Sequence, residues 1–404
     1  MSDEKMECKD TTAAPRKLDF RILSMVFILV GMWTLFRFEV GAFYFSGESI
    51  AKLSRDMATW TILAAGMTLV IVSGNIDLSV GSLLALVVGC CAFMLDPEEG
   101  MGWSTSTALV FALLVGLGLG LWQGFLTAYF RIPAFIVTLA GLFMFRGFTQ
   151  KVSAKDPRVP NDSWANIFGF SYVSPNMGWV LGAIVCALIV VLVVWGVKRK
   201  RKLGIGADGN FMMLLKIVVP CFLVLGFIYK VNEYKGIPAQ TIVMLSVMAV
   251  MYFVARYTRF GRHVFAIGGN AEAARLSGIN VERNTMAVFA ITGLLCGIAG
   301  IVWMAQNQGA TQKAGEWYEL YAIAACVIGG TSLMGGRGSV FGSLIGALVM
   351  ATVIQGMDYT GLENWIQLVV RGGVLAVAVG IDVASKTPPP WMVKVGNYIK
   401  PKSG

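Results

Sequence analysis

The feature that most constrains this chain is a succession of apolar segments close to the length of a membrane span. Of its 404 residues, 56% are hydrophobic and only 14% are charged, whereas a soluble globular domain has about 25% charged residues. One membrane crossing takes about 20 apolar residues, so roughly a dozen crossings fit and leave little room for a soluble domain. The composition argues against a water-soluble enzyme, and also against a disordered chain, which would be poor in apolar residues.

Twelve apolar segments can be read along the chain. They are 22–38, 57–73, 78–95, 104–122, 133–148, 178–197, 211–229, 238–255, 285–304, 319–333, 339–357 and 363–381. We therefore predict an all-α polytopic membrane protein with about twelve transmembrane helices. Some segments are short, so re-entrant or broken helices are alternatives at 57–95 and at 319–357.

The predicted organisation is a transmembrane domain over 22–381 between two polar tails, 1–21 and 382–404. No A-x-A-like site follows the first apolar run, which favours an uncleaved first span over a removed signal peptide. Lys and Arg collect in cytoplasmic loops. With the N-terminus inside and alternating spans, 21 of the 33 basic residues fall inside and ten outside. This bias predicts that both termini and the loop 256–284 are cytoplasmic, and that the net charge of +10 reflects topology and not nucleic-acid binding.

The sequence lacks the common motifs of nucleotide binding and hydrolysis. It contains no G-x-x-x-x-G-K-[ST], no G-x-S-x-G and no H-E-x-x-H. The seven cysteines form no C-x-x-C pair and, apart from Cys8, lie in apolar runs, which is typical of small buried side chains. His263 is the one histidine, so we predict neither a metal site nor catalytic residues.

Small residues recur every four positions in several apolar segments. They include Gly81, Ala85 and Gly89; Gly116, Gly120 and Gly124; Gly293 and Gly297; and Gly338, Gly342 and Gly346. This spacing aligns them on one helix face, where another backbone can approach closely. The stripes indicate close helix packing, and a helix that slides during transport would use the same surface.

Polar residues interrupt the apolar pattern between the second and third segments. Asn75 and Asp77 lie in the stretch GNIDLSVGS, with Asp77 where a helix is expected to begin. A carboxylate there accepts hydrogen bonds from free backbone amides. It is either the N-cap of a tight inner turn or part of a broken helix beside a transport path.

Further polar candidates occur elsewhere in the membrane domain. Thr331 and Ser332 lie in the glycine-rich stretch 329–338, which either hinges or turns between two segments. Arg371 lies within the last apolar run, where a charge needs a partner or water; a structural ion pair and a pore-facing role are both open. Gln123 near the inner end of segment 104–122, and Asn307 at the outer mouth, offer neutral hydrogen-bonding groups.

The loop 256–284 contains a recognisable short helix. Asn270 can cap a helix over 271–277, and Gly278 can end it. A helix of this length does not persist alone in water. The segment is therefore either a solvated basic loop or a docking helix for a cytoplasmic partner.

Four stretches together resemble the permease subunits of bacterial ABC importers for ribose, arabinose and xylose. They are GNIDLSVGS (74–82), PAFIVTLAGLFMFRG (133–147), FGRHVFAIGGNAEAARLSGINV (260–281) and CVIGGTSLMGGRG (326–338). Within that group the chain is most similar to the D-xylose permeases, on the segment EYKGIP (233–238) and on an insert of two segments joined by the basic run 198–202. Asn75 departs from the D-xylose pattern.

The resemblance implies a fold, partners and a location. It implies a ten-helix core like that of the vitamin B12 importer permease plus two inserted helices, in a multi-pass protein of the bacterial inner membrane surrounded by lipid. Two permease copies would form the path, a cytoplasmic subunit would bind ATP and Mg²⁺, and an extracytoplasmic sugar-binding protein would deliver the monosaccharide. This chain would carry no cofactor and bind no nucleic acid. The ATPase would dock on residues of the loop, namely Gly268, Gly269, Asn270, Glu272, Ala273, Arg275, Leu276 and Gly278.

The sequence leaves two kinds of alternative open. The importer could carry galactose, glucose, arabinose or ribose in place of D-xylose. A single-chain facilitator or proton symporter with twelve spans, or less readily a channel, is the rival from another class. A symporter needs membrane-embedded carboxylates, and Asp77 is the one candidate that the sequence offers.

Overall fold

Helices form nearly all of the structure, a computed structural model that describes residues 20–386 except 162 and 204–208. The helices are α1 (Phe20–Val40), α2 (Gly47–Asp56), α3 (Ala58–Val72), α4 (Val80–Leu95), α5 (Thr105–Ala128), α6 (Ala134–Val152), α7 (Ile167–Phe170), α8 (Pro175–Lys202), α9 (Asn210–Asn232), α10 (Ala239–Tyr257), α11 (Arg259–Gly269), α12 (Ala271–Leu276), α13 (Val281–Asn307), α14 (Tyr318–Ile328), α15 (Val340–Tyr359) and α16 (Asn364–Lys386). Short 3₁₀ turns, η1 (Ala42–Phe45) and η2 (Trp164–Asn166), follow α1 and precede α7. Each predicted apolar segment is helical, which confirms the helical class.

Six described helices are both long and apolar enough to cross a membrane: α5, α8, α9, α10, α13 and α15. The pair α2–α3, bent by 41° at its break, makes a seventh if counted as one span. The chain is therefore a polytopic membrane protein. The total of twelve crossings stays a prediction, as does the domain division; most of the predicted tails, 1–21 and 382–404, lies outside the described residues.

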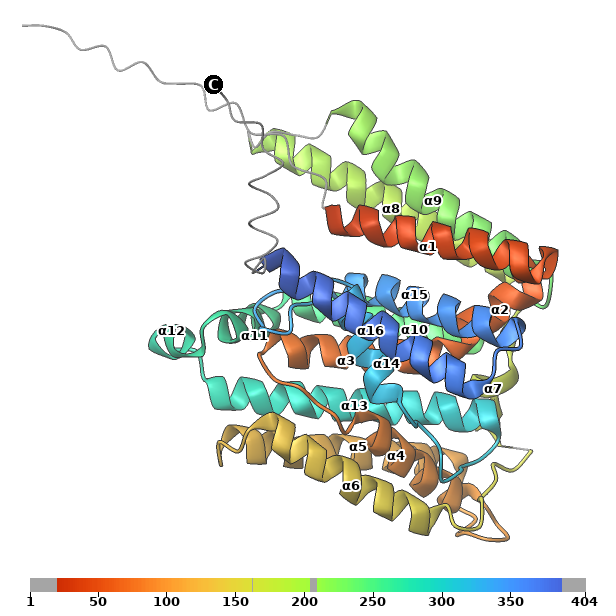
Figure 1. Cartoon of the computed structure of the whole chain (residues 1–404), viewed down its shortest axis with the longest axis vertical. Coiled ribbons are helices and arrows are strands. Elements are labelled where there is room, and N and C mark those ends of the chain that lie inside the picture. The colour runs from red at the N-terminus through yellow and green to blue at the C-terminus, as the bar shows by residue number, and fades with distance from the viewer. Residues whose placement is uncertain (1–19, 162, 204–208, 387–404) are drawn as a thin grey trace, which may run out of the picture.

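Two predicted spans are interrupted, as the short apolar runs suggested. Helix α4 has 16 residues and α14 has 11, and at 1.5 Å per residue neither covers a bilayer core about 30 Å thick. Irregular segments precede and follow them at 73–79 and 329–339. In Figure 1 the connection from α3 runs diagonally inward to α4. Both regions therefore contain short helices bounded by irregular segments in place of a continuous span, and the choice between a re-entrant and a broken helix stays a prediction.

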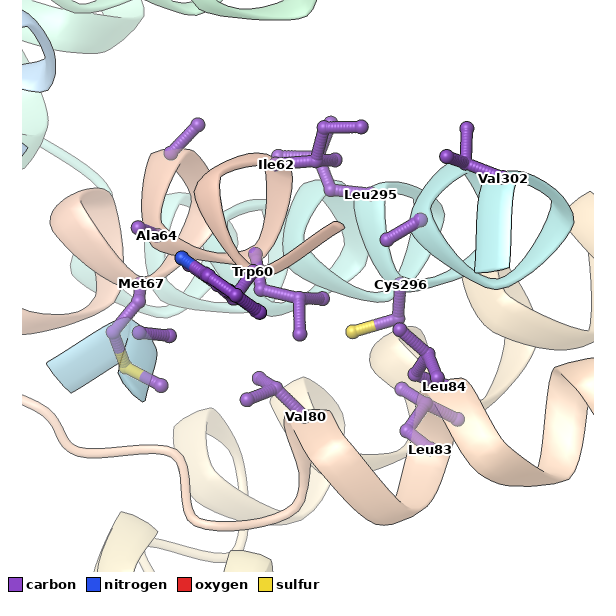
Figure 2. Packing of buried hydrophobic residues seen from close by; sticks show 14 of the residues in the cluster. Trp60, Ile62, Ala64, Met67, Val80, Leu83, Leu84, Leu295, Cys296 and Val302 are labelled. Atoms are coloured by element: carbon purple, nitrogen blue, oxygen red, sulfur yellow. The ribbon is translucent and has the colours of Figure 1, made fainter. Parts of the chain in front are cut away.

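The centre of the bundle is built by α3 and α13. Every residue of α3 is buried, and α13 packs along α5 on one side and against α3 and α4 on others. Figure 2 shows Trp60 and Met67 of α3, Leu84 of α4 and Cys296 of α13 among the packed side chains. The six described cysteines are free thiols that are buried or half-buried, as predicted; Cys8 lies outside the described residues.

The glycine stripes are where helix backbones meet. A Cβ atom added at Gly120 of α5 would lie 2.4 Å from the Phe289 carbonyl oxygen of α13. One added at Gly293 would lie 2.2 Å from the Gly116 carbonyl oxygen, and one at Gly346 of α15 would lie 2.1 Å from the Ala325 carbonyl oxygen of α14. The packing interpretation of these stripes is therefore confirmed.

The two inserted helices form a peripheral hairpin. Helices α8 and α9 pack mainly on each other, and α9 also contacts α2. In Figure 1 they lie at the edge of the bundle, beyond α15 and α10. A ribbon of two short strands, β1 (Tyr172–Val173) and β2 (Ile237–Pro238), joins the chain before and after the hairpin; the all-α prediction did not include it.

Helices α11 and α12 project from one end of the bundle (Figure 1). The start of α1 and the end of α16 lie at this same end, as do the end of α8 and the start of α9. These are the segments that the charge bias groups together on one side. The arrangement therefore agrees with the predicted alternation of chain direction from one span to the next.

Asp96 anchors the loop at the opposite end. One carboxylate oxygen accepts the backbone N–H groups of Glu98 and Glu99 at 2.9 and 3.1 Å, and the other accepts that of Arg158 at 2.8 Å. Burial by itself raises the pKa of Asp96, but these three donors and the Arg158 charge outweigh it and hold the pKa below its usual range. The side chain, only 6% exposed, thus links two loops that are distant in sequence.

We expect Asp96→Asn to destabilise the protein by about 1–3 kcal/mol at pH 7, because the amide turns a donor toward backbone N–H groups. A lowered pKa means that the stabilisation is present above the unfolded value of about 3.9 and is lost as pH falls through the lower folded value. The unfolding midpoints of wild type and variant, measured in detergent, should therefore converge below about pH 4. A constant gap from pH 7 to pH 3 would contradict a role for the charge.

Candidate functional site

The projecting helix α12 presents most of the predicted docking residues to solvent. The side-chain carbonyl oxygen of Asn270 accepts the backbone N–H of Ala273 at 2.9 Å, as expected of an N-cap. Gly278 follows with φ +82°, which ends the helix. The helix covers 271–276, one residue shorter than predicted. Leu276 is 83% exposed, which is a large apolar surface for a residue on a polar loop.

Charge pairs hold α12 against the start of α13. Arg275 donates to Glu282 at 2.5 Å and lies 3.9 Å from Glu272. Ala274 is buried below them. Glu272 and Ala273 remain exposed. The end of α12 is therefore an outward-facing helical element that is paired with the start of α13 through Arg275 and Glu282.

The longer helix α11 precedes α12 and was not predicted. Thr258 caps it, with its hydroxyl oxygen accepting the Gly261 backbone N–H at 3.1 Å. Val264 and Ile267 are buried one helical turn apart. The cap and this apolar spacing were the signals for α11 in the sequence.

Gly268 and Gly269 join α11 to the core. A Cβ atom at Gly268 would lie 1.6 Å from the Val72 carbonyl oxygen at the end of α3. The glycine-rich stretch 329–338 completes this junction, because the Gly336 backbone N–H donates to the same Val72 oxygen at 2.8 Å. Gly268 is half-buried and packs directly against the end of α3, so α11, α3 and the glycine-rich stretch meet at one point.

Two predicted path residues meet through a third that was not predicted. The Ser79 backbone N–H and hydroxyl donate to Asp77 Oδ1 at 2.8 and 2.7 Å. The Gln123 amide nitrogen of α5 donates to the Ser79 hydroxyl oxygen at 2.8 Å. All three side chains are at most 2% exposed. The N-cap of α4 is Ser79, so Asp77 lies two residues before it and accepts hydrogen bonds from the N-cap residue. That this turn borders a transport path stays a prediction.

Four other predicted path residues lie apart from this network. Asn75 bonds locally to the Ser73 hydroxyl at 3.0 Å. Ser332 accepts the Met334 backbone N–H at 3.3 Å within the glycine-rich turn, and the hydroxyl of the buried Thr331 has no partner among the described residues. Asn307 is exposed and donates to the Trp303 carbonyl oxygen at 2.8 Å.

Arg371 of α16 has neutral partners in place of an ion pair. It donates to the Tyr321 hydroxyl at 2.6 Å and to the Gln367 amide oxygen, and its guanidinium lies 5.7 Å from the Tyr321 ring centroid. Within the described residues it has no carboxylate partner, and the choice between an ion pair and a pore-facing role stays a prediction. Its Nε is buried and has no partner in the part of the chain that the structure describes.

An aromatic cluster that the sequence reading missed adjoins Arg371. Trp60 of α3 meets the rings of Tyr318 and Tyr321 edge-on, with centroids 5.7 and 5.6 Å apart. The indole N–H of Trp60 is buried and has no partner among the described residues. Aromatic rings and donors of this kind suit a neutral polyol, whose C–H groups pack on rings and whose hydroxyl oxygens accept hydrogen bonds.

A second buried carboxyl accompanies Asp77. Glu319 of α14 is 9% exposed, and its Oε2 lacks a partner in the described part of the chain. It lies against the start of α4, because a Cβ at Gly81 would come 2.1 Å from that oxygen. The sequence reading placed Glu319 at the edge of a span and overlooked it. No three His, Cys, Asp or Glu side chains among the described residues could hold a metal ion.

Comparisons with known proteins place these features in context. The model of the family described as branched-chain amino acid transport system / permease component matches residues 49–206 and 206–379. The xylose transport system permease protein XylH of Escherichia coli (strain K12) is 37% identical over 371 residues, which cover 92% of this chain and 94% of that protein.

Two further relatives are transport permeases as well. The protein of that name from Haemophilus influenzae is 38% identical over 375 residues, covering 92% of this chain and 98% of that protein. The ribose import permease protein RbsC of Escherichia coli (strain K12) is 32% identical over 339 residues, covering 84% and 87%. No solved structure matches the chain.

Proposed function

The chain belongs to the branched-chain amino acid transport system / permease component family, and from this membership we propose that it is the membrane subunit of an ATP-driven importer of D-xylose. The choice of D-xylose rests on the relatives named for xylose transport, because they match 92% of the chain at 37–38% identity. The ribose relative matches less of the chain at lower identity. The chain is a multi-pass protein of the bacterial inner membrane.

The proposed assembly contains two copies of this chain, a cytoplasmic ATPase and an extracytoplasmic sugar-binding protein. ATP and Mg²⁺ are held by the ATPase, and this chain is a transport subunit without catalytic residues. The end of the bundle that carries α12 faces the cytoplasm. The charge bias supports this orientation. In agreement with it, the described ends of α1 and α16 lie at the same end of the bundle as α12 (Figure 1).

The proposed coupling route runs from α12 to the broken helices. The exposed Leu276 contacts the ATPase, and closure of the ATPase pair pushes on α12. Helix α11 transmits this displacement through Gly268 to the end of α3 and to the glycine-rich turn. Both elements lead directly into interrupted spans, which move at lower cost than continuous helices because their backbone hydrogen bonds are already broken.

The proposed sugar path is bounded by neutral hydrogen-bonding groups. Ser79 and Gln123 offer a hydroxyl and an amide, and Trp60 offers a buried indole N–H that has no partner among the described residues. A path of this kind releases its sugar readily, so that selectivity rests mainly on the binding protein. It requires that the outer and inner ends open in turn, since these side chains are buried in the structure.

The test is reconstitution of the chain in proteoliposomes with a cytoplasmic ATPase and a sugar-binding protein of a xylose importer. The proposal expects uptake of labelled D-xylose only when both partners and ATP are present, and competition by unlabelled D-xylose in preference to ribose, arabinose, galactose or glucose. Full uptake without the partners would identify a facilitator or symporter. Preference for another sugar would support the assignment as an importer but contradict D-xylose as its substrate.

A further inference from the structure

A cavity of about 520 Å³ lies beside the α10–α11 junction, at the end of the bundle that carries α12. Its walls come from α3, α10, α11 and the segment that enters α15. The residues that define its chemistry are Thr68, Tyr252, Arg256, Arg262, Phe265 and Ser339. None of them belongs to the polar network around Asp77 or to α12.

The cavity is strongly basic. Arg256 and Arg262 both line it, and the stretch from Met251 to Ala271 contains three arginines and no acidic residue. Neither lining arginine has a carboxylate within salt-bridge distance in the described part of the chain. Tyr252 and Ser339 add hydroxyl groups to the same walls. Two guanidinium groups with hydroxyl donors nearby form a receptor for a phosphate group.

An apolar strip of α10 leads away from the cavity. Leu245 and Tyr252 are 45% and 41% exposed, and Ala249 between them is exposed as well. Their spacing of four and three residues places them on the helix face that also carries Arg256. Helix α10 is apolar enough to cross the membrane, so this strip lies along the hydrocarbon of the bilayer, directly below the two arginines.

We propose that the cavity binds one anionic phospholipid, with its phosphate between Arg256 and Arg262 and its acyl chains along the exposed strip of α10. The juxtaposition of a basic cavity and a membrane-facing apolar strip favours lipid over a second docking surface for the ATPase, which would have no use for Leu245 and the ring of Tyr252. The orientation proposed above assigns the lipid to the cytoplasmic leaflet, where phosphatidylglycerol and cardiolipin supply the negative headgroups.

The bound lipid links elements that the coupling route displaces. It bridges α10 to α11 by way of the two arginines, and it reaches the residues that lead into α15. Because it stabilises one arrangement of these helices, lipid occupancy should set how readily a push on α12 moves α11 against α3. The site would thus make the activity of the importer sensitive to the anionic lipid content of the membrane.

The test is native mass spectrometry of the full chain purified in detergent and supplied with phosphatidylglycerol. Wild type should retain bound lipid, and the double variant Arg256→Gln/Arg262→Gln should bind at least about tenfold more weakly. Arg259→Gln is the matched control, because Arg259 begins α11 and is exposed but does not line the cavity. It should bind within about twofold of wild type.

A second double variant, Arg256→Lys/Arg262→Lys, guards against a folding defect, since it keeps both charges and should retain more lipid than the glutamine variant. Equal loss in Arg259→Gln, or unchanged binding in both double variants, would overturn the proposal. The proposal would also be overturned if 10 mM inorganic phosphate displaced the lipid. It would likewise be overturned if the glutamine double variant lost ATPase capture but kept its bound lipid. The measurement needs no transport, so its failure is separate from failure of the proposed function.

Discussion

A permease with Leu276→Asp should lose at least tenfold in affinity for its ATPase, and its ATP-driven sugar uptake should fall with it. Leu276 is 83% exposed on a helix that projects from the bundle. Burying a leucine in a partner pocket is worth about 1.5–3 kcal/mol, and an aspartate there adds the cost of an unpaired buried charge. Capture of the purified ATPase by the immobilised permease measures the first effect, and proteoliposome uptake measures the second.

The matched control for this prediction is Leu203→Asp. Leu203 is 60% exposed and follows α8 at the same end of the bundle, far from α12 in the fold. It should leave ATPase capture unchanged. Charge reversal at Glu272 should also uncouple ATP hydrolysis from transport. Arg275 is a less clean probe, because its reversal also breaks the pair with Glu282. Normal capture and coupled hydrolysis by Leu276→Asp would exclude α12 as the docking element.

Gly120→Val is expected to abolish the folded permease, or to lower its unfolding midpoint more than any other change considered above. The new Cβ would lie 2.4 Å from the Phe289 carbonyl oxygen and 3.0 Å from the Gly293 Cα. Both neighbours are backbone atoms of α13, so relief requires the two helices to separate. Overpacking of a core typically costs 1–3 kcal/mol, and separation of the α5–α13 pair should reach or exceed the upper end of that range. Fluorescence-detected size exclusion after stepwise heating measures the effect.

Gly118→Val provides the control two residues away on the same helix. A Cβ at Gly118 has no neighbour within 4 Å and the residue is exposed, so valine should be tolerated there. Similar melting of both variants would show that helix propensity, and not the close approach of α5 to α13, governs the response. Normal stability of Gly120→Val alone would contradict the packing described for this interface.

The helices and their packing stripes could be predicted because both depend on local pattern. Apolar runs near 20 residues form helices in a bilayer, where every backbone polar group must be satisfied within the segment. Four-residue glycine spacing marks one face of a helix whatever surrounds it. The N-cap at Asn270 and the end of the helix at Gly278 could likewise be predicted, since a cap involves only a few neighbouring residues.

Only part of the candidate site could be predicted from the sequence. Asp77 and Gln123 were recognised as polar residues in apolar surroundings, yet the serine that joins them is unremarkable in sequence. Arg371 was recognised as needing a partner, but Tyr321 lies 50 residues earlier on another helix. Trp60, Tyr318 and Glu319 gave no signal, because aromatic residues and helix-terminal carboxylates are common in membrane proteins. Such groupings depend on how helices are placed in three dimensions.

The sequence alone determined that this chain is a helical membrane protein, which side its basic loops favour and which residues break its apolar runs. Those properties follow from the transfer of side chains and backbone between water and lipid, which acts on each segment separately. The tertiary structure decided that α3, α11 and the glycine-rich turn meet at the Val72 carbonyl, and that two arginines share a cavity above an apolar strip. These contacts join residues far apart in the chain, and only packing of the helices brings them together.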